Sequence, residues 1–378
     1  MKWKEVLEIK SGKNQKDVAD INGSYPIYGS GGIIGYSKEY LCPAGTTIIG
    51  RKGTINSPLY VNEPFWNVDT AFGLIPSQQL VSKYLYYFCC YFNFKALDKS
   101  TTIPSLAKRD LENVEMPIPP LDEQSRIVAR IEELFSELDK AVDTLKTTKE
   151  QLEVYRQAVL KDAFDNAQAM CERFTPIEEL LVTDRKGMST GPFGTMLKKH
   201  EHKTTGVPML GIENIDSGKF IDGNKIFVTP EKAAELKSFA LKSGDIIISR
   251  SGTVGELCVV PPRMEGALLS TNLMRVSLDC QKVLPEYFIY LFQSKGIVLD
   301  QVKELCKGST RIFLNQTILK QIQFPIPNVH EQLQIINTIE SRLTFCDNIE
   351  KTVDTALAQA DAMRQSILKQ AFEAEKKV

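Results

Sequence analysis

The chain has few of the side chains that many enzymes use for metal or acid–base chemistry. It has only three histidines in 378 residues, and none of its eight cysteines forms a Cys-x-x-Cys pair. Two of the histidines flank Glu201 in a Lys-rich segment, which we interpret as a solvated turn rather than a metal site. Structural zinc sites need clustered Cys and His ligands, so we expect none here.

Catalytic signatures are missing as well. No Gly-x-x-x-x-Gly-Lys-Ser/Thr loop for a nucleotide is present. The dipeptide Pro261-Pro262 lacks the flanking residues of the Asn/Asp-Pro-Pro-Tyr/Phe motif of amino-methyltransferases. Glu8-Ile9-Lys10 has the end of a nuclease Glu-x-Lys motif, but no matching Asp lies on a nearby predicted strand. These absences argue against an enzyme.

Long apolar runs and strong net charge are also absent. No run reaches the ~18 apolar residues of a membrane helix, and no apolar run of a signal peptide follows Met1–Glu5. The cysteines do not fit a disulfide framework, so we expect a reducing cytoplasm.

The net charge of −1 is unevenly divided along the chain. Residues 1–115 and 171–324 carry net charges of +2 and +3, whereas residues 116–170 and 325–378 carry −4 and −2. The mildly basic segments are compatible with an approach to a phosphate backbone, and the acidic ones with protein contacts.

The strongest positive feature is an internal repeat. Residues 117–164 align without a gap with residues 325–372, and 18 of the 48 aligned positions are identical. Each copy opens with a Pro-Ile-Pro motif, of the form Pro-Ile-Pro-x-x-x-Glu-Gln, and closes on Ala-Phe. Because a repeat fixes the architecture, we predict two equal halves, each a globular segment followed by one copy.

Each copy of the repeat is predicted to be a long helix. The prolines of the Pro-Ile-Pro motif end the preceding segment, and Asp122 suits the N-cap position. Apolar residues then recur at steps of four and three, which is typical of a coiled coil. About 43 residues at ~1.5 Å each give roughly 65 Å, so each helix needs a long partner.

We expect the two copies to pair as an antiparallel coiled coil, which would make the molecule pseudo-two-fold. From periodicity alone, the alternative is any helical hairpin or dimer stalk. The pattern also includes Tyr155 and is broken at Thr148 and Arg342. The predicted seam consists chiefly of Ile127, Ile131, Leu134, Leu138, Leu145, Leu152, Ile335, Ile339, Ile349, Val353, Met363 and Ile367.

The globular segments are predicted to be α+β and to share one plan. In each, a strand rich in isoleucine ends in an Arg-x-Gly-Thr turn. The matched pairs are Tyr25–Gly29 with Val207–Gly211, Gly45–Thr54 with Gly244–Thr253, the Tyr84 helix with Glu286–Phe292, and Lys99–Ile103 with Lys307–Arg311. We therefore predict a tandem duplication, with globular domains 1–115 and 171–324 and long helices in 116–170 and 325–378.

With these features, the sequence resembles the specificity subunits of type I restriction–modification systems over essentially its full length. The Pro-Ile-Pro motifs Pro117–Gln124 and Pro325–Gln332, the helix endings Arg156–Phe164 and Arg364–Phe372, and the Arg-x-Gly-Thr turns carry the resemblance. It implies that each globular segment is a target recognition domain reading one half of a split, asymmetric DNA site. It also implies that the helices set the gap between the half-sites.

The resemblance further implies partners. Two methyltransferase subunits would dock on this chain, and motor–nuclease subunits would join them. The chain itself would have no catalysis and bind no cofactor, so S-adenosylmethionine, ATP and Mg²⁺ would belong to the partner subunits. The alternatives are a coiled-coil scaffold that does not bind DNA, and a degenerate nuclease or methyltransferase.

Candidate DNA-contacting residues lie in polar turns, most of them at matched positions in the two halves. Arg51 and Arg250 end equivalent strands, and arginine suits bidentate contact with guanine or with phosphate. The alternative is a structural turn in which the arginine pairs with a carboxylate. The candidates are Arg51, Lys52, Thr54, Ser100, Thr101, Thr102, Lys198, Lys199, Arg250, Ser251, Thr253, Ser309, Thr310 and Arg311.

Overall fold

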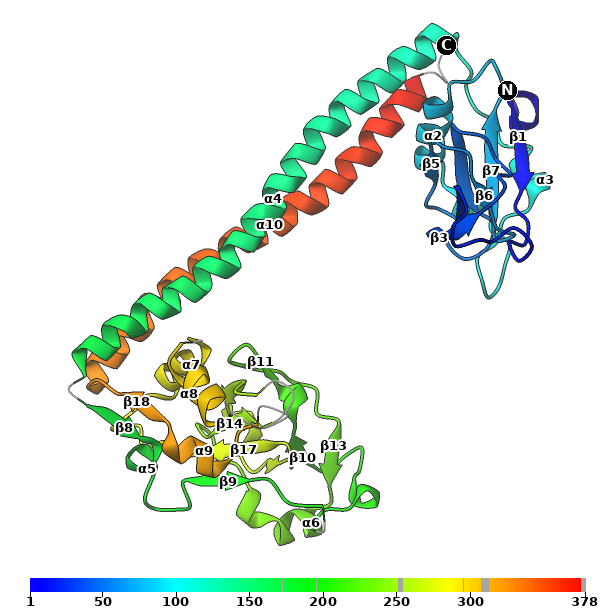
Figure 1. Cartoon of the computed structure of the whole chain (residues 1–378). Coiled ribbons are helices and arrows are strands. Elements are labelled where there is room, and N and C mark those ends of the chain that lie inside the picture. The colour runs from blue at the N-terminus through cyan, green and yellow to red at the C-terminus, as the bar shows by residue number, and fades with distance from the viewer. Residues whose placement is uncertain (172, 195, 251–253, 295, 307–312, 375–378) are drawn as a thin grey trace. The chain divides into compact units, whose positions relative to one another are not determined.

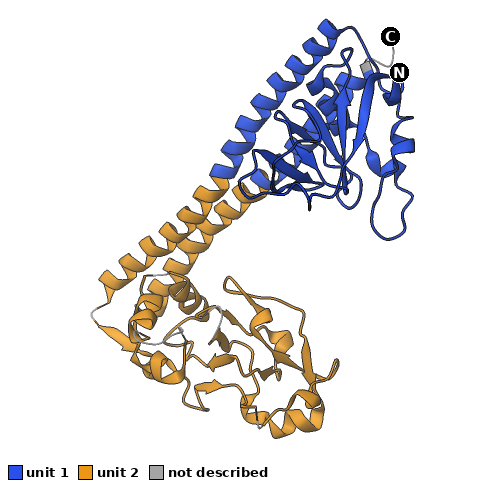
Figure 2. Ribbon diagram, turned by 45° about the vertical axis from the view of Figure 1, so that its right-hand side comes forward, with its two compact units in different colours: residues 1–147, 353–378 blue, residues 148–352 orange. Residues whose placement is uncertain are grey.

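The computed structural model describes residues 1–171, 173–194, 196–250, 254–294, 296–306 and 313–374. The chain divides into two compact units, residues 1–147 with 353–378 and residues 148–352 (Figure 2). Helix α4 (Leu121–Met170) and helix α10 (Val329–Ala374) each contribute to both units. Each unit therefore combines one globular segment with a part of both long helices.

The main sheet of unit 1 is antiparallel, with the strand order β1-β7-β4-β5 (Figure 1). Its apolar strand β4 is buried along its whole length because it lies between two neighbours. A second sheet has the order β3-β2-β6, in which β2 runs parallel to β6 and antiparallel to β3. The strands are β1 (Leu7–Ser11), β2 (Tyr25–Gly29), β3 (Gly32–Ser37), β4 (Thr46–Gly50), β5 (Leu59–Val61), β6 (Trp66–Asn67) and β7 (Ala71–Pro76).

Unit 2 repeats this topology. Its main antiparallel sheet has the order β9-β17-β14-β15, and its second sheet pairs β10 parallel to β16 and antiparallel to β13. The predicted tandem duplication is therefore confirmed in strand order and in strand direction. The strands are β9 (Met188–Thr190), β10 (Val207–Leu210), β13 (Ile226–Val228), β14 (Ile246–Ser249), β15 (Leu257–Val259), β16 (Leu268–Leu269) and β17 (Leu273–Val276).

Short helices complete both units. In unit 1 they are α1 (Trp3–Val6), α2 (Ser82–Tyr91), the 3-10 helix η1 (Phe94–Leu97) and α3 (Lys108–Leu111). In unit 2 they are α5 (Ile177–Leu180), η2 (Lys199–Glu201), η3 (Ile212–Asn214), α6 (Pro230–Glu235), η4 (Lys237–Phe239), η5 (Pro262–Met264), α7 (Pro285–Gln293), α8 (Val298–Leu305) and α9 (Gln316–Gln321). Unit 2 also has two small strand pairs, β11 (Ile215–Asp216) with β12 (Lys219–Phe220) and β8 (Phe174–Pro176) with β18 (Gln323–Pro325).

Both long helices contribute to the hydrophobic core of each unit. The core of unit 1 takes Val128 and Ile131 from α4, and Leu368 and Phe372 from α10. The core of unit 2 takes residues at the same positions of the repeat, 208 residues away. They are Ile336, Ile339, Leu160 and Phe164. At about 25 cal/mol per Å² of apolar surface removed from water, such side chains are worth roughly 1.5–3 kcal/mol each, so helix and globular segment stabilise each other.

The Pro-Ile-Pro motifs attach each globular segment to its helix. The Tyr84 hydroxyl donates a hydrogen bond to the Pro117 carbonyl at 3.1 Å, and its ring packs edge-on against Phe372 at 5.2 Å. In unit 2, the Tyr287 hydroxyl donates to the Pro325 carbonyl at 2.8 Å, and its ring packs against Phe164 at 5.3 Å. The same three-part contact thus occurs once in each unit.

The predicted antiparallel pairing of the helices is confirmed within each unit. In unit 1, Arg364 of α10 forms an ion pair with Asp139 of α4 and lies over the Phe135 ring at 4.9 Å. In unit 2, Arg156 of α4 pairs with Asp347 of α10 at 2.7 Å. Arg364 and Asp347 lie 208 residues after Arg156 and Asp139, so one ion pair is repeated.

The predicted seam is correct for most of its residues and wrong for Met363. Met363 is 54% exposed, and its repeat equivalent Tyr155 is 46% exposed. Five residues further along each helix, Leu160 and Leu368 are buried in the globular cores. The buried side of each helix therefore no longer faces the other long helix at this point. The fully buried seam residues are Ile131, Leu152, Ile339 and Val353, and the half-buried ones are Ile127, Leu134, Leu138, Leu145, Ile335, Ile349 and Ile367.

Candidate nucleic-acid interface

Arg51 follows directly after β4 and is held by the turn that precedes β7. Its backbone N–H donates to the Thr70 carbonyl at 2.8 Å, and its guanidinium Nη1 donates to the Asp69 carbonyl at 3.3 Å. The side chain is half-buried. A guanidinium has five N–H donors, so this anchoring fixes its direction and leaves donors for a ligand.

Arg250 follows β14 and is held in the equivalent way. Its backbone N–H donates to the Asn272 carbonyl at 3.0 Å, and its Nη1 donates to the Thr271 carbonyl at 3.2 Å. Its Nε also donates to the Leu314 carbonyl at 3.4 Å. Both arginines are thus anchored to backbone carbonyls, and the predicted alternative of a carboxylate partner is not seen among the described residues.

The turn after β4 needs its glycines. A Cβ on Gly50 would lie 2.0 Å from the Thr54 carbonyl oxygen, and Gly53 has a φ of +79°. Only glycine fits both conditions without strain. This close return of the chain leaves Lys52 and Thr54 exposed on the surface.

The loop at residues 98–105 joins the Arg51 turn. The Gly53 N–H donates to the Pro104 carbonyl at 2.8 Å. The backbone of Lys52 pairs with that of Ser105 in a single antiparallel β-bridge. The structure therefore brings two groups of predicted residues together: Arg51, Lys52 and Thr54 with Ser100, Thr101 and Thr102.

Asp98 organises this loop from inside. Its Oδ1 accepts the Ser100 hydroxyl at 2.6 Å and the backbone N–H groups of Ser100 and Ser105 at 3.0 and 3.1 Å. These hydrogen bonds, the hydroxyl of Ser100 first, lower the pKa of Asp98 below its ordinary value. The Ser100 hydroxyl is therefore engaged within the loop, and the exposed hydroxyls of Thr101 and Thr102 are the better donors to a ligand.

Lys13 belongs to the same edge of unit 1 and was missed in the sequence. It follows the end of β1, where the Gly12 N–H donates to the Ala71 carbonyl at 3.1 Å and the Lys13 N–H to the Asn67 carbonyl at 3.0 Å. A Cβ on Gly12 would lie 1.8 Å from the Val68 oxygen, which explains the glycine. The sequence signal that could have identified Lys13 is the Gly12-Lys13 pair directly after a strand.

The remaining predicted residues divide into two groups. Lys198 and Lys199 are exposed at η2, and the neighbouring Leu197 packs with Met209 in the cluster around the second sheet, apart from the Arg250 turn. Nothing in the contacts of the described residues joins them to Arg250. Ser251, Thr253, Ser309, Thr310 and Arg311 lie outside the described residues.

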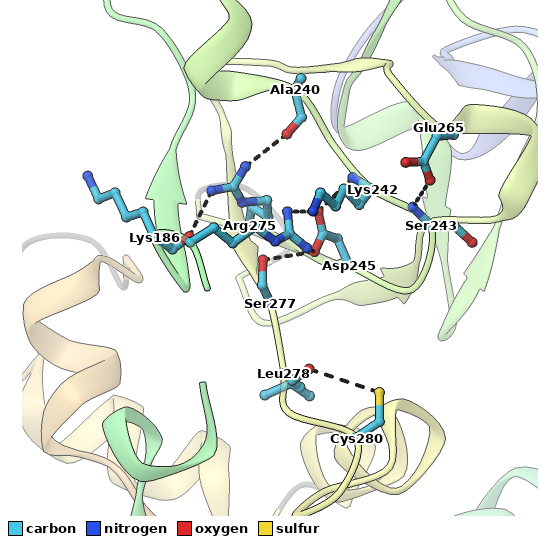
Figure 3. Close-up of polar contacts among 11 residues, drawn as sticks. Lys186, Ala240, Lys242, Ser243, Asp245, Glu265, Arg275, Ser277, Leu278 and Cys280 are labelled. Carbon is cyan, nitrogen blue, oxygen red and sulfur yellow. Dashed lines mark hydrogen bonds and ion pairs between the residues drawn. The ribbon is translucent and has the colours of Figure 1, made fainter. Parts of the chain in front are cut away.

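A buried polar network holds β14, the strand that precedes Arg250 (Figure 3). Asp245, which precedes β14, is 1% exposed and accepts two hydrogen bonds from Arg185, at 3.1 and 2.5 Å, and one from the Ser277 hydroxyl at 2.8 Å.

The nearby Arg275 is 4% exposed and donates to the carbonyls of Ala240 and Lys186. Burial lowers the pKa of Arg275 from its ordinary value. Removing one partner would leave a buried charge, so this network fixes the β14–β17 pair.

Candidate metal ligands are not clustered among the described residues. Within these ranges, no group of three or more His, Cys, Asp or Glu side chains could hold a metal ion. Nor does any helix of the described chain have the length and apolar character to cross a membrane. The described residues of both turns offer hydrogen-bond donors and positive charge.

Three comparisons place the chain among known proteins. Residues 1–154 and 193–359 match the family described as type I restriction modification DNA specificity domain. The Type I restriction enzyme EcoBI specificity subunit of Escherichia coli is 23% identical over 94% of this chain and 78% of its own length. The EcoKI specificity subunit of E. coli K12 is 26% identical over 86% of this chain and 73% of its own.

A solved structure shows the same fold. It comes from work on complex assembly and conformational transition of the type I R-M system, and it aligns with a TM-score of 0.73 at 15% identity. The alignment covers 98% of this chain and 96% of that one. With two globular units of one topology, matched arginine turns and a family match over most of its length, this chain belongs to the specificity subunits of type I restriction–modification systems.

Proposed function

We propose that each unit reads one half of a split DNA site through the edge of its main sheet where β4 or β14 ends. The observation that carries the proposal is the matched pair of arginines. Arg51 and Arg250 occupy the same place in two units of one topology, and both are fixed by carbonyls of the following turn. A fixed arginine suits the recognition of a guanine edge, since its donors are already directed.

The neighbouring groups suit phosphate rather than bases. Lys13 and Lys52 supply positive charge beside Arg51, and the hydroxyls of Thr101 and Thr102 supply neutral donors. Phosphate contacts position a protein on DNA, and base contacts specify the sequence. We assign sequence reading to the arginine turns and positioning to these flanking residues.

We further propose that the paired helices set the gap between the half-sites and dock two methyltransferase subunits, which restriction subunits join. The acidic charge of residues 116–170 supports contact with protein rather than with phosphate. Adenine methylation and cleavage, with S-adenosylmethionine, ATP and Mg²⁺, then belong to the partners, and this chain binds no cofactor. All eight cysteines are free, which supports a cytoplasmic location.

A domain exchange tests the proposal. Residues 1–115 are replaced by the first recognition domain of another family member that keeps the contacts made by Tyr84 and Pro117. The methylated motif of the resulting complex should change in one half-site only. A motif changed in both halves would contradict the assignment of one half-site to each unit.

A further inference from the structure

Two adjacent isoleucines lie exposed at the tip of the β2–β3 hairpin in unit 1. Ile33 is 53% exposed and Ile34 is 59% exposed, and only Gly32 separates them from the turn at Ser30 and Gly31. Tyr36, further along the same strand, is 48% exposed. Exposing neighbouring large apolar side chains costs free energy in water, and such patches mark contact sites.

A β-bulge sets the direction of these side chains. Tyr28 pairs with Ile33 and Ile27 pairs with Gly35, so Ile34 is the extra residue opposite no partner. Its Cγ2 lies 3.6 Å from the position that a Cβ on Gly29 would occupy. Bulges re-aim side chains at sheet edges and functional sites, and here the bulge places two apolar groups at the tip.

The strand directions place this tip beside the Arg51 turn. Because β2 and β6 are parallel, the chain leaves both strands at the same edge of the sheet. The Val68 N–H donates to the Tyr28 carbonyl at 3.0 Å. The backbone carbonyl of the next residue, Asp69, accepts a hydrogen bond from the Arg51 guanidinium at 3.3 Å. On the other side, the Lys13 N–H donates to the Asn67 carbonyl.

We propose that Ile33 and Ile34 make apolar contact with bases of the half-site that unit 1 reads. The inference rests on the proposed function and adds a specificity-determining group to it. The occupant is DNA because the apolar tip lies between Lys13, whose charge suits a phosphate, and Arg51, whose fixed donors suit a guanine edge. An apolar side chain there can meet a thymine methyl group or enter a base step.

The equivalent connection in unit 2 is built differently, which makes the hairpin tip specific to one half-site. Its equivalent strands β10 and β13 are joined by residues 211–225, which contain η3, β11 and β12, in place of a two-residue turn. Recognition of the second half-site therefore serves as an internal control in the same complex.

The test uses the full chain assembled with its methyltransferase subunits, on a duplex carrying the mapped motif. The double variant Ile33→Ser/Ile34→Ser should bind this duplex about tenfold more weakly and discriminate less against changes in the first half-site. Discrimination in the second half-site should not change. The variant Ile33→Leu/Ile34→Leu should keep most of the affinity, because it keeps the apolar surface.

Ile21→Ser is the matched control. Ile21 is 93% exposed, and it lies near the far end of β3, where the Asp20 N–H donates to the Tyr36 carbonyl at 2.9 Å. This variant should bind like the native chain. It separates an effect of the hairpin tip from a general loss of exposed apolar surface.

Two probes identify the kind of contact, and three results bear on the proposal as a whole. Replacing thymine by uracil in the first half-site weakens binding if a methyl group is touched, and 2-aminopurine fluorescence rises if a base step is opened.

Unchanged affinity and discrimination in the serine variant would overturn the proposal. Loss of assembly with the methyltransferase subunits would also overturn it, because the tip would then be a protein contact. A native complex that prefers no duplex would instead refute the proposed function.

Discussion

The buried side-chain amide of Gln124 accepts a hydrogen bond from the backbone N–H of Val81 at 2.8 Å. Its Nε2 donates to the carbonyls of Gln79 and Pro119 at 3.0 and 2.8 Å. Gln332 makes the same three contacts in unit 2, accepting from Leu284 and donating to Lys282 and Pro327, all at 2.8 Å. The glutamine that ends each Pro-Ile-Pro motif thus joins the start of a long helix to the start of α2 or α7.

The first prediction concerns this glutamine contact. Gln124→Leu should lower the free energy of unfolding of unit 1 by about 1–3 kcal/mol, because the Val81 N–H and two carbonyls lose a buried partner. Hydrogen exchange at the start of α2 and urea unfolding measure the effect. Gln332→Leu should act in the same way at α7. Gln151→Leu, at an exposed position of α4, is the control and should change stability little.

The second prediction concerns the matched arginines. Arg51→Lys should weaken base discrimination in the first half-site, and Arg250→Lys should weaken it in the second. Lysine keeps the positive charge but loses the planar set of directed N–H donors. Each loss of bidentate contact should cost about 1–3 kcal/mol of discrimination. Sequencing of methylated sites measures it. If either variant altered both half-sites, the turns would not act separately.

The third prediction concerns the flanking lysines. Lys52→Gln and Lys13→Gln should each reduce the slope of log affinity against log salt by about 1, since each removes one phosphate contact. Base preferences should stay the same in both variants. Titrations of the methyltransferase complex at several salt concentrations provide the measurement. A changed sequence preference with an unchanged slope would assign these lysines to bases.

The fourth prediction concerns pH. Cys42 is buried and donates to Asn67 Oδ1 at 3.3 Å, and burial raises the pKa of its thiol from 9.0 to about 12. Between these values the unfolded chain loses the proton first. Stability from this thiol is therefore fully present below pH 9 and is lost as pH rises toward 12. In urea unfolding between about pH 7.5 and 10.5, Cys42→Ala should show a shallower decline than the native chain. Equal slopes would contradict the burial of the thiol.

The fifth prediction concerns the spacing. Seven residues added to both helices, after Thr147 and before Val353, keep the heptad phase and add ~10 Å at ~1.5 Å per residue. The preferred gap between the two DNA half-sites should grow by about three base pairs at ~3.4 Å each. An unchanged gap in a complex that still assembles would rule out the helices as the spacer.

The repeat made much of the architecture predictable from sequence. The matched strands around Arg51 and Arg250 were visible because strand ends and glycine turns have local signals. The antiparallel pairing followed from two helices too long to be buried alone. The Glu-Gln pair of the Pro-Ile-Pro motif was visible in the sequence, but its role was not, since the partner of Gln124 lies 43 residues earlier in the chain.

The parts that could not be predicted depend on long-range packing. Periodicity gives one buried face, so Met363 was expected in the seam. The structure gives each helix a second buried face, where Leu160 and Phe164 enter a globular core. Lys13 was missed for a similar reason, because only the pairing of β1 with β7 brings it to the Arg51 edge. The engagement of the Ser100 hydroxyl by Asp98 was likewise invisible in a polar loop.

Whether this chain directs methylation to a split site can be tested by a genome-wide map of N6-methyladenine in a host that expresses it with its methyltransferase subunit. We expect a split motif with a fixed gap, which disappears when this chain is deleted and changes in one half when Arg51 is replaced. A stable complex of the two proteins that leaves no methylated motif would contradict the reading of DNA by this chain.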